Sequence, residues 1–382
     1  MGLGEIMLTG KIEHIRIQNY KSLAEVDVNL EDLTILVGAN ASGKSNFIDA
    51  LRLVRDALSN GLDREIDQRG SIGSLRTRLS KPNLGDISIE LDLTINSEQA
   101  HYGFVLHSAR ENDYVVKREV CRFGSEEYEF EEGTLVHTSN TSLKLEPIVG
   151  EKALALPLIR NARDSRQELL YDFLVKMRFF AILPEKLGEP QRRLNPSPLQ
   201  ESGENLARVL ENIVTNESET WRRDALYEGL ADIVPGVVRD DAISVAAAGD
   251  YLVINVSHEN NRKFPLGIES DGTRRAIALL ASIYQNYPFS LLAIEEPELM
   301  LHPHAAGVLT DNLNAASLRS QILFTTHSPD LIARFKADSL RIVEMVQGIT
   351  QIGPLRDDQR QAINDQLFNG GDLLRIEGLK RD

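Results

Sequence analysis

The sequence contains little cysteine, no long apolar segment and fewer basic than acidic residues. Its single cysteine, Cys121, excludes a disulfide framework within the chain and a multi-cysteine zinc site. No apolar run approaches the roughly 20 residues that a membrane-spanning helix needs, so we expect no membrane partner. The N-terminal segment MGLGEIMLTG has no basic start followed by an apolar stretch. We therefore expect no signal peptide and a cytoplasmic protein.

The charge balance is acidic, because 57 Asp and Glu residues face 42 Lys and Arg residues and give a net charge of −15. Such a surface repels nucleic-acid phosphates, so any contact with DNA would need a local basic patch. The alternative is that each basic pair is a solvated charge balanced by nearby acids. The arginines that could form a patch are Arg69, Arg76, Arg78, Arg192, Arg193, Arg222 and Arg223.

The N-terminal part of the chain predicts strands, a loop and a helix. The 382 residues allow two or three domains at roughly 150 residues each. KIEHIRIQNY and AEVDVNL alternate apolar and polar residues, as half-buried antiparallel strands do. LTILVG is continuously apolar, which is typical of a strand buried on both faces. After a glycine-rich turn, SNFIDALRLVRDAL has its apolar residues at helical spacing.

The middle and the C-terminal part differ in pattern. Residues 86–148 consist of short alternating runs separated by Gly, Asn, Ser and Asp, which predicts an antiparallel β meander. From about 151 to 235 the apolar period is helical, including RQELLYDFLVKMRFF, and the Pro- and Arg-rich GEPQRRLNPSPLQESG is predicted to be an exposed loop. Strands then return at AISVAA and YLVINVSHE, followed by the helix TRRAIALLASIYQNY and two buried strands.

The strongest motif is GANASGKS at Gly38–Ser45, which fits G-x-x-x-x-G-K-[ST] between the predicted strand and helix. The backbone N–H groups of such a loop surround a β-phosphate at the positive end of the helix dipole. Lys44 could reach the β- and γ-phosphates, and the Ser45 hydroxyl could bind Mg²⁺. The alternative is a chance glycine-rich turn, which the strand–loop–helix context disfavours.

A second motif, SLLAIEEPELMLHP at Ser290–Pro303, is an apolar strand that ends in Glu295 and Glu296. In an open α/β sheet this end lies beside the phosphate loop. Consecutive strand residues point to opposite faces, so the two glutamates must have different tasks. One would hold the hydration shell of Mg²⁺ and the other would orient or deprotonate an attacking water. Alone, the motif could equally be an acidic turn on a surface strand.

Two further motifs carry polar residues. ILFTTHSPDLI delivers His327 at a strand end, where a neutral imidazole could bond a γ-phosphate oxygen. A lone histidine is, however, more often structural. The sequence S-D-G-T at Ser270–Thr273 precedes a predicted helix and could offer free N–H groups to an anion. Taken alone, it is better explained as an ordinary helix cap.

In this order, the four motifs resemble those of ABC-type ATPases, and the chain is similar to the SMC, RecF and OLD branch of AAA family ATPases. The matching segments are IEHIRIQNYKSL, GANASGKSN continuing into FIDAL, IEEPELMLHP and TTHSPDLI, and they cover about residues 11–60 and 262–335. The resemblance implies an α/β P-loop NTPase fold, an ABC-ATPase head with a mixed parallel core sheet. The middle of the chain lies outside the matching segments, so the antiparallel β meander and the helical lobe are predicted from periodicity alone. The resemblance implies two parts of one ATPase domain, residues 1–150 and 240–382, separated by a helical lobe at 151–239.

The resemblance also implies roles for individual residues. Gly38–Ser45 would be the Walker A loop and Leu291–Glu296 the Walker B strand, with Glu296 as catalytic carboxylate and His327 as switch histidine. The signature motif would be Ser270–Thr273, which in this family contacts the γ-phosphate of ATP held by the other subunit. The implied residues are Lys44, Glu296 and His327 for catalysis, Ser45 and Glu295 for Mg²⁺, and Gly38, Ala39, Asn40, Ala41, Ser42, Gly43, Lys44, Ser45, Asn46, Ser270, Asp271, Gly272 and Thr273 for ATP.

The sequence departs from the family pattern at three places. Glu295 stands where the family most often has aspartate, and S-D-G-T keeps only Ser270 and Gly272 of the usual S-G-G core of L-S-G-G-Q. Spacing does not fix the glutamine of the Q-loop, for which Gln68 is the candidate. The head-to-tail homodimer that the family implies would close around two ATP molecules and open after hydrolysis.

The sequence predicts an ATPase and leaves two coupled tasks open. No heptad run follows the phosphate loop, so a long-armed SMC tether is excluded. The segment after His327 is about half a typical domain and lacks a complete metal constellation, so we expect no nuclease on this chain. The first hypothesis is a DNA-associated ATPase in repair or in defence against foreign DNA, with a separately encoded effector or nuclease. The second is an ATP-dependent regulatory switch that recruits a protein partner without contacting DNA.

Overall fold

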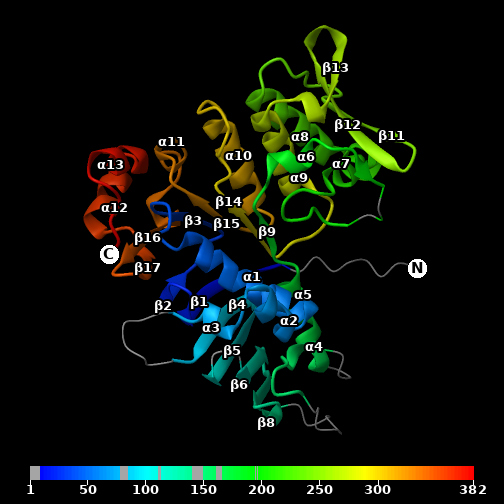
Figure 1. The fold of residues 1–382 in the computed structure, drawn as a ribbon. Helices are drawn as coiled ribbons and strands as arrows, with labels where there is room; N and C mark the ends of the chain where they lie inside the picture. The colour runs from blue at the N-terminus through cyan, green and yellow to red at the C-terminus, as the bar shows by residue number, and fades with distance from the viewer. Residues whose placement is uncertain are drawn as a thin grey trace.

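Within the residues that the structure describes, the fold consists of three β-sheets and the helices around them (Figure 1). The computed structural model describes residues 9–77, 85–110, 113–139, 149–160, 166–193, 195 and 197–382. One sheet has seven strands, a second has six, and the third is a smaller sheet at the outer end of a helical lobe. No helix in these ranges is long and apolar enough to cross a membrane.

The six-stranded sheet is the centre of the fold, with the strand order β17-β16-β3-β15-β14-β9. Neighbours are parallel from β16 to β9, and β17 is antiparallel to β16. Strands β3 and β15 are buried along their whole length, as continuously apolar runs predict. The predicted mixed parallel core sheet is confirmed. Its strands are β3 (Leu33–Val37), β9 (Arg178–Phe180), β14 (Leu291–Glu295), β15 (Gln321–Thr326), β16 (Leu340–Val346) and β17 (Ile349–Pro354).

The seven-stranded sheet is antiparallel throughout and has the order β2-β1-β4-β5-β6-β7-β8. The predicted β meander is confirmed as β4 to β8, and it continues the sheet that β1 and β2 begin. The last part of the predicted meander, residues 140–148, lies outside the described residues. The strands are β1 (Gly10–Tyr20), β2 (Leu23–Asn29), β4 (Ile87–Ile95), β5 (Glu98–Arg110), β6 (Asp113–Phe123), β7 (Glu126–Glu131) and β8 (Thr134–Thr138).

Alternate side chains of the central strands belong to two hydrophobic cores. Leu36 on β3 and Leu323 on β15 share one core with helix α1 (Lys44–Asn60) and the seven-stranded sheet. Their neighbours Ile35 and Phe324 share the other core with the helices on the opposite face. Because both faces are covered, polar residues that follow these strands are left at the carboxyl edge of the sheet, where α1 begins.

The helical lobe packs α7, α8, α9 and α10 together and carries the small sheet of β10 to β13 (Figure 1). The small-sheet strands are β10 (Gln191–Arg192), β11 (Ile243–Ala248), β12 (Tyr251–His258) and β13 (Arg262–Pro265). The remaining helices are α2 (Leu62–Gln68), α3 (Ile72–Leu75), α4 (Leu156–Ile159), α5 (Gln167–Val175), α6 (Pro184–Leu187), α7 (Leu206–Thr215), α8 (Thr220–Ile233), α9 (Asp271–Tyr284), α10 (Ala305–Ser317), α11 (Pro329–Ile332), α12 (Asp357–Asn364) and α13 (Gly370–Ile376).

One prediction for the middle of the chain is wrong, and a second needs a correction at two residues. The helix predicted for RQELLYDFLVKMRFF ends at Val175, and Arg178–Phe180 form strand β9 instead, parallel to β14. The strand is favoured because Phe179 is buried in one core and Phe180 in the other. The described part of the segment predicted as an exposed loop has no helix, and its one strand is the two-residue β10. In β10 the buried Gln191 accepts a hydrogen bond of 2.6 Å from a backbone N–H of α7.

Candidate active site

The phosphate loop joins β3 to α1, and its backbone depends on glycine. Gly43, the residue before the first helical turn, has a φ of 107°, which residues with a Cβ rarely adopt. A Cβ on Gly43 would lie 1.9 Å from Oγ1 of Thr350, and a Cβ on Gly38 would lie 2.2 Å from the carbonyl oxygen of Val343. The loop is therefore packed tightly against the β16–β17 hairpin, which fixes it at the N-terminus of α1.

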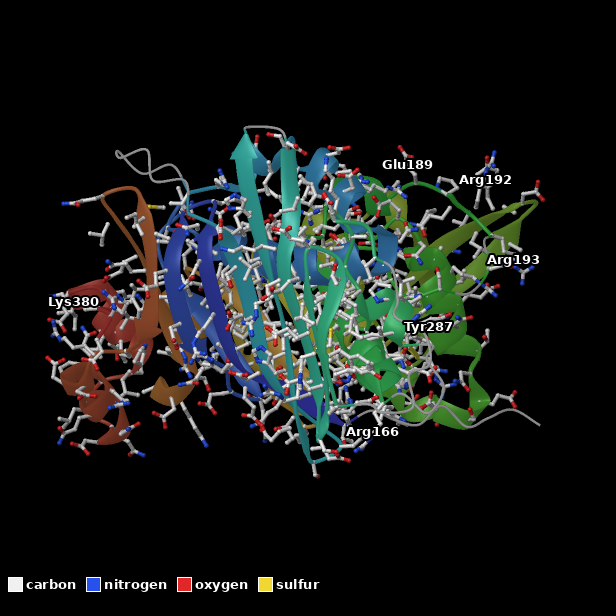
Figure 2. All side chains as sticks on the ribbon, turned by 90° about the horizontal axis from the view of Figure 1, so that it is seen from below. Arg166, Glu189, Arg192, Arg193, Tyr287 and Lys380 are labelled. Carbon is white, nitrogen blue, oxygen red and sulfur yellow. The ribbon has the colours of Figure 1, made fainter. Side chains whose placement is uncertain are left out.

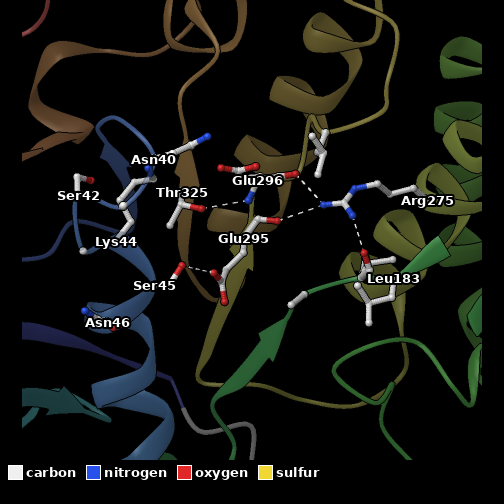
Figure 3. A pocket seen from close by; sticks show the side chains of 15 residues that line it. Asn40, Ser42, Lys44, Ser45, Asn46, Leu183, Arg275, Glu295, Glu296 and Thr325 are labelled. Carbon is white, nitrogen blue, oxygen red and sulfur yellow. Dashed lines mark hydrogen bonds between the residues drawn. The ribbon is translucent and has the colours of Figure 1, made fainter. Parts of the chain in front are cut away.

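A cavity of about 600 Å³ opens at this helix N-terminus (Figure 3). Its walls are the phosphate loop, the carboxyl end of β14, the segment after β9 and one arginine of α9. The lining residues are Asn40–Asn46, Ala181–Leu183, Arg275, Glu295, Glu296, Leu299 and Thr325. The volume is in the usual range for small-molecule sites. The fold thus brings the predicted Walker A residues and both predicted glutamates to one cavity.

Lys44 and Ser42 give this cavity the chemistry of a phosphate site. The Lys44 ammonium donates to the carbonyl oxygens of Gly38 at 2.7 Å and Ala39 at 2.9 Å. Burial lowers the pKa of Lys44, and the attraction of the nearby glutamates opposes this shift. The Ser42 hydroxyl is buried and has no hydrogen-bond partner among the described residues. Phosphate oxygens would replace the carbonyls at Lys44 and satisfy the Ser42 hydroxyl, so these residues fit a nucleotide phosphate.

Ser45 and Glu295 meet on the same side of the cavity. The Ser45 hydroxyl donates to Oε2 of Glu295 at 2.6 Å (Figure 3). Oε1 of Glu295 lies 3.5 Å from the guanidinium of Arg52. A hydroxyl and a carboxylate are ligands that Mg²⁺ accepts, and Mg²⁺ at nucleotides keeps waters and phosphate oxygens as its other ligands. No group of three or more His, Cys, Asp or Glu residues that could hold a metal occurs in the described ranges. The two residues therefore fit Mg²⁺ that is bound together with a nucleotide.

Glu296 faces a different partner from Glu295, and it lies just beyond the end of β14 rather than within the strand. Nδ1 of His327 lies 3.2 Å from Oε1 of Glu296, so the structure brings the two predicted catalytic residues together. The backbone of Glu296 is left-handed, with a φ of 46°. Its N–H donates to the carbonyl oxygen of Thr325 at 3.2 Å and to Oγ1 of the same residue at 3.1 Å. The adjacent strand β15 thus holds the glutamate at the cavity edge.

The predicted signature motif, Ser270–Thr273, does not line this cavity. Ser270 caps α9 by accepting a hydrogen bond of 3.1 Å from the N–H of Thr273, and the side chain of Asp271 is 58% exposed. Gly272 packs against the loop that follows β14, since a Cβ there would lie 2.8 Å from the carbonyl oxygen of Met300. The motif is therefore close to the loop that follows β14 and is not part of the cavity at the chain's own phosphate loop.

The candidate Q-loop residue Gln68 is not part of the site. It lies exposed at the end of α2 and lines a different cavity, which the far end of α1 also lines. Part of the cavity wall is instead formed by Ala181–Leu183, directly after β9. Sequence reasoning missed these residues because β9 itself was predicted as helix.

Sequence reasoning also missed two arginines and one glutamate beside the site. Arg275 lines the cavity, and Arg52 contacts Glu295 and lies 3.2 Å from a carboxylate oxygen of Glu201. Glu298 accepts a hydrogen bond from the hydroxyl of Thr326, and burial raises its pKa. The one sequence signal for Arg275 was a charged residue within the apolar stretch of a predicted helix.

The seven arginines proposed as a basic patch do not form one in the described part of the chain. Arg76 is buried and donates to a backbone carbonyl, whereas Arg78 lies outside the described residues. Arg192 and Arg193 lie at the end of the molecule opposite Lys380 (Figure 2). Four of the seven arginines are paired with acids: Arg69 with Asp49, Asp56 and Glu65, Arg193 with Glu211, Arg222 with Glu219, and Arg223 with Asp224.

Comparisons with known proteins agree with this geometry. Residues 33–333 match the family described as "AAA domain, putative AbiEii toxin, Type IV TA system". A segment of 127 residues, 32% of this chain, is 26% identical to "DNA replication and repair protein RecF" of Bacillus cytotoxicus and covers 34% of that protein. The protein of the same name from Gloeobacter violaceus is 27% identical over 169 residues, 44% of this chain and 38% of its own. The matching segment thus spans little more than a third of the length of these relatives.

Solved structures of SMC heads share the fold. The structure titled "Crystal structure of the SmcHead bound to the C-winged helix domain of ScpA" has a TM-score of 0.58 at 14% identity, over 91% of this chain and 99% of that one. An Smc head domain from Pyrococcus furiosus has a TM-score of 0.56 at 15% identity, over 94% of this chain and 100% of that one. The family match includes β3, the phosphate loop, β14 and His327. The chain therefore belongs to this AAA domain family, and its fold is that of the SMC heads.

Proposed function

We propose that this chain binds ATP and hydrolyses it to ADP and phosphate. Glu296 would accept a proton from the water that attacks the γ-phosphorus, while the bond from that phosphorus to the β–γ bridging oxygen breaks and ADP leaves with the oxygen. Lys44 would stabilise charge on the phosphates. Mg²⁺, held by Ser45 and Glu295, would supply neutralisation of phosphate charge. The observation that carries this proposal is the meeting of the Ser45–Glu295 and Glu296–His327 pairs at one phosphate loop.

The active form would be a head-to-tail homodimer with ATP between a phosphate loop and the partner's signature motif. Two features support this proposal. The signature motif lies outside the chain's own cavity, so it is available to contact ATP in the cavity of a second subunit. Large apolar side chains are also exposed around the cavity and the motif: Leu183 at 45%, Ile268 at 70%, Leu299 at 41% and Met300 at 54%. Exposed apolar residues grouped in this way are typical of protein interfaces.

Ser270→Asp should separate a helix cap from a shared ATP site. Aspartate caps helices as well as serine does, so folding and ATP binding by the phosphate loop should be unchanged. Its negative charge would face the γ-phosphate of the other subunit's ATP and should reduce ATP-dependent dimerisation and hydrolysis more than about tenfold. Binding of a fluorescent ATP analogue, size-exclusion chromatography with ATP and phosphate release would measure these effects.

Ser71→Asp is the matched control, because Ser71 caps α3 in the same way by accepting from the N–H of Ser74. This variant should behave as the wild type in all three assays. Wild-type hydrolysis by Ser270→Asp would mean that Ser270 is only a helix cap and that the ATP site is not shared.

The coupled task that we propose is DNA-associated, in repair or in defence against foreign DNA, with a separately encoded effector. Its support is the similarity to proteins named for DNA replication and repair and to a family named for a toxin–antitoxin system. The second candidate is a regulatory switch that recruits a protein partner. Local neutralisation of the arginines and the net charge of −15 favour this candidate.

Duplex DNA should distinguish the two tasks. If the first is correct, DNA should stimulate ATP hydrolysis, and its affinity should fall steeply between about 50 and 200 mM salt because phosphate contacts release counterions. Fluorescence anisotropy with labelled duplex and phosphate release with and without DNA would measure both effects. Hydrolysis that is indifferent to DNA, with no salt-dependent binding, would favour the partner-recruiting switch.

A further inference from the structure

Arg275 is a buried arginine that connects three segments around the cavity. It lies in the first turns of α9, and only 5% of the residue is exposed. Its guanidinium donates to the carbonyl oxygens of Ile182 at 2.5 Å, Glu296 at 2.8 Å and Glu295 at 3.2 Å (Figure 3). Burial lowers its pKa, and the nearby glutamates Glu298 and Glu296 oppose that shift. A cation held by carbonyls at this position links α9 to the end of the Walker B strand.

The bond to Glu296 matters because the backbone of that residue is strained. A left-handed φ of 46° is unfavourable for a residue with a Cβ and persists only where surrounding contacts hold it. The N–H of Glu296 is held by Thr325 of β15. Its carbonyl accepts from Arg275 of α9 and from the N–H of Leu299 at 3.0 Å. The direction of the glutamate side chain therefore depends on the position of α9.

The start of α9 is also the signature motif. Ser270 caps the helix, and Arg275 follows five residues later on the same rigid element. The neighbouring Arg274 donates to the carbonyl oxygen of Pro184 at 3.2 Å, so the helix start is tied twice to the segment that follows β9. A shift of the signature end of α9 must move Glu296 or break the bonds of Arg275.

We propose that Arg275 is a positioning residue that makes hydrolysis by Glu296 depend on the position of the signature helix. The proposal rests on the proposed ATPase function and adds a coupling between the two sites of the dimer. Contact of one subunit's signature motif with its partner's ATP would set the carboxylate in that subunit's own cavity. ATP binding at one site would then affect hydrolysis at the other, which predicts positive cooperativity in ATP concentration.

The test compares Arg275→Gln and Arg275→Lys with a matched buried arginine. Arg341 on β16 also donates to three backbone carbonyls, at 2.6, 2.8 and 3.1 Å, and it does not line the cavity. For each variant, the assays are thermal unfolding, affinity for a fluorescent ATP analogue, ATP-dependent dimerisation, and kcat with its Hill coefficient.

Arg275→Gln should lower kcat at least tenfold and reduce the Hill coefficient to 1, while nucleotide affinity and dimerisation stay within about twofold of wild type. Arg275→Lys keeps the charge and should retain part of both kcat and cooperativity. Arg341→Gln should lower the unfolding temperature without changing the Hill coefficient.

Wild-type kcat and cooperativity in Arg275→Gln would overturn the proposal. The proposal would also be overturned if the variants that lose kcat always lose nucleotide binding too, because Arg275 would then have only a structural role. An equal loss of kcat in Arg341→Gln would lead to the same conclusion. If wild type hydrolyses no ATP, the proposed ATPase function fails and this proposal fails with it. If the wild type hydrolyses ATP but shows no cooperativity in ATP concentration, the proposed ATPase function is retained and the proposed role of Arg275 is rejected.

Discussion

Replacing Glu296 by glutamine should lower kcat by about 10²–10⁴-fold, the range that one general base contributes. Glutamine has nearly the same shape and can keep a hydrogen bond with His327, but it cannot accept the proton of the attacking water. ATP binding depends on the phosphate loop and should persist. The variant should therefore accumulate as an ATP-bound dimer, which size-exclusion chromatography with ATP would show beside a phosphate-release assay.

Glu298→Gln is the matched control for this experiment. Glu298 lies on the same loop and undergoes the same chemical change, but it bonds Thr326 and does not line the cavity. Its kcat should stay within a few-fold of wild type. Equal losses in the two variants would point to general damage to the loop, and full activity of Glu296→Gln would exclude Glu296 as the base.

The site residues with a fixed sequence context could be predicted from the sequence. Gly38–Ser45 and Glu295 each follow a continuously apolar strand, and parallel strands in a sheet bring their carboxyl ends to one edge. Glu295 is the last residue of β14, whereas Glu296 follows it with a left-handed backbone, so the alternation of side chains along a strand does not explain their different contacts. Motif and periodicity together thus predict which groups lie at this edge of the sheet, but not the direction of Glu296.

Features that depend on long-range contacts could not be predicted in the same way. Strand β9 has only three residues, and its conformation is set by pairing with β14, over 100 residues later. The β16–β17 hairpin, which packs behind the phosphate loop, was not predicted because no motif marks it. In the sequence, Arg275 is one arginine of a predicted helix, and only the fold shows that it contacts the carbonyl oxygens of Ile182 and Glu296. In each case the conformation or the contacts of a segment depend on residues that are far from it in the sequence.

Gly43→Ala should abolish nucleotide binding and also destabilise the protein. The φ of 107° is unfavourable for alanine, a strain that costs about 1–3 kcal/mol. The new methyl group would in addition lie within 2.8 Å of three side-chain atoms of Thr350, whose hydroxyl donates to the carbonyl oxygen of Ser42 at 2.9 Å. The loop must shift to remove this overlap, and a shifted loop no longer directs its backbone N–H groups at the phosphates.

Gly61→Ala separates strain from steric overlap on the same helix. Gly61, at the other end of α1, has a φ of 96°, but no atom lies within 4 Å of the position that a Cβ would take there. This variant should lose stability through strain alone and keep wild-type affinity for a fluorescent ATP analogue. Adding Thr350→Ala to Gly43→Ala removes two of the three overlapping atoms, so it should restore part of the free energy of unfolding, measured in urea, and part of the nucleotide affinity. The loop of Gly43→Ala cannot keep its present backbone conformation. If this variant nevertheless binds the ATP analogue with wild-type affinity, the loop does not hold the phosphates.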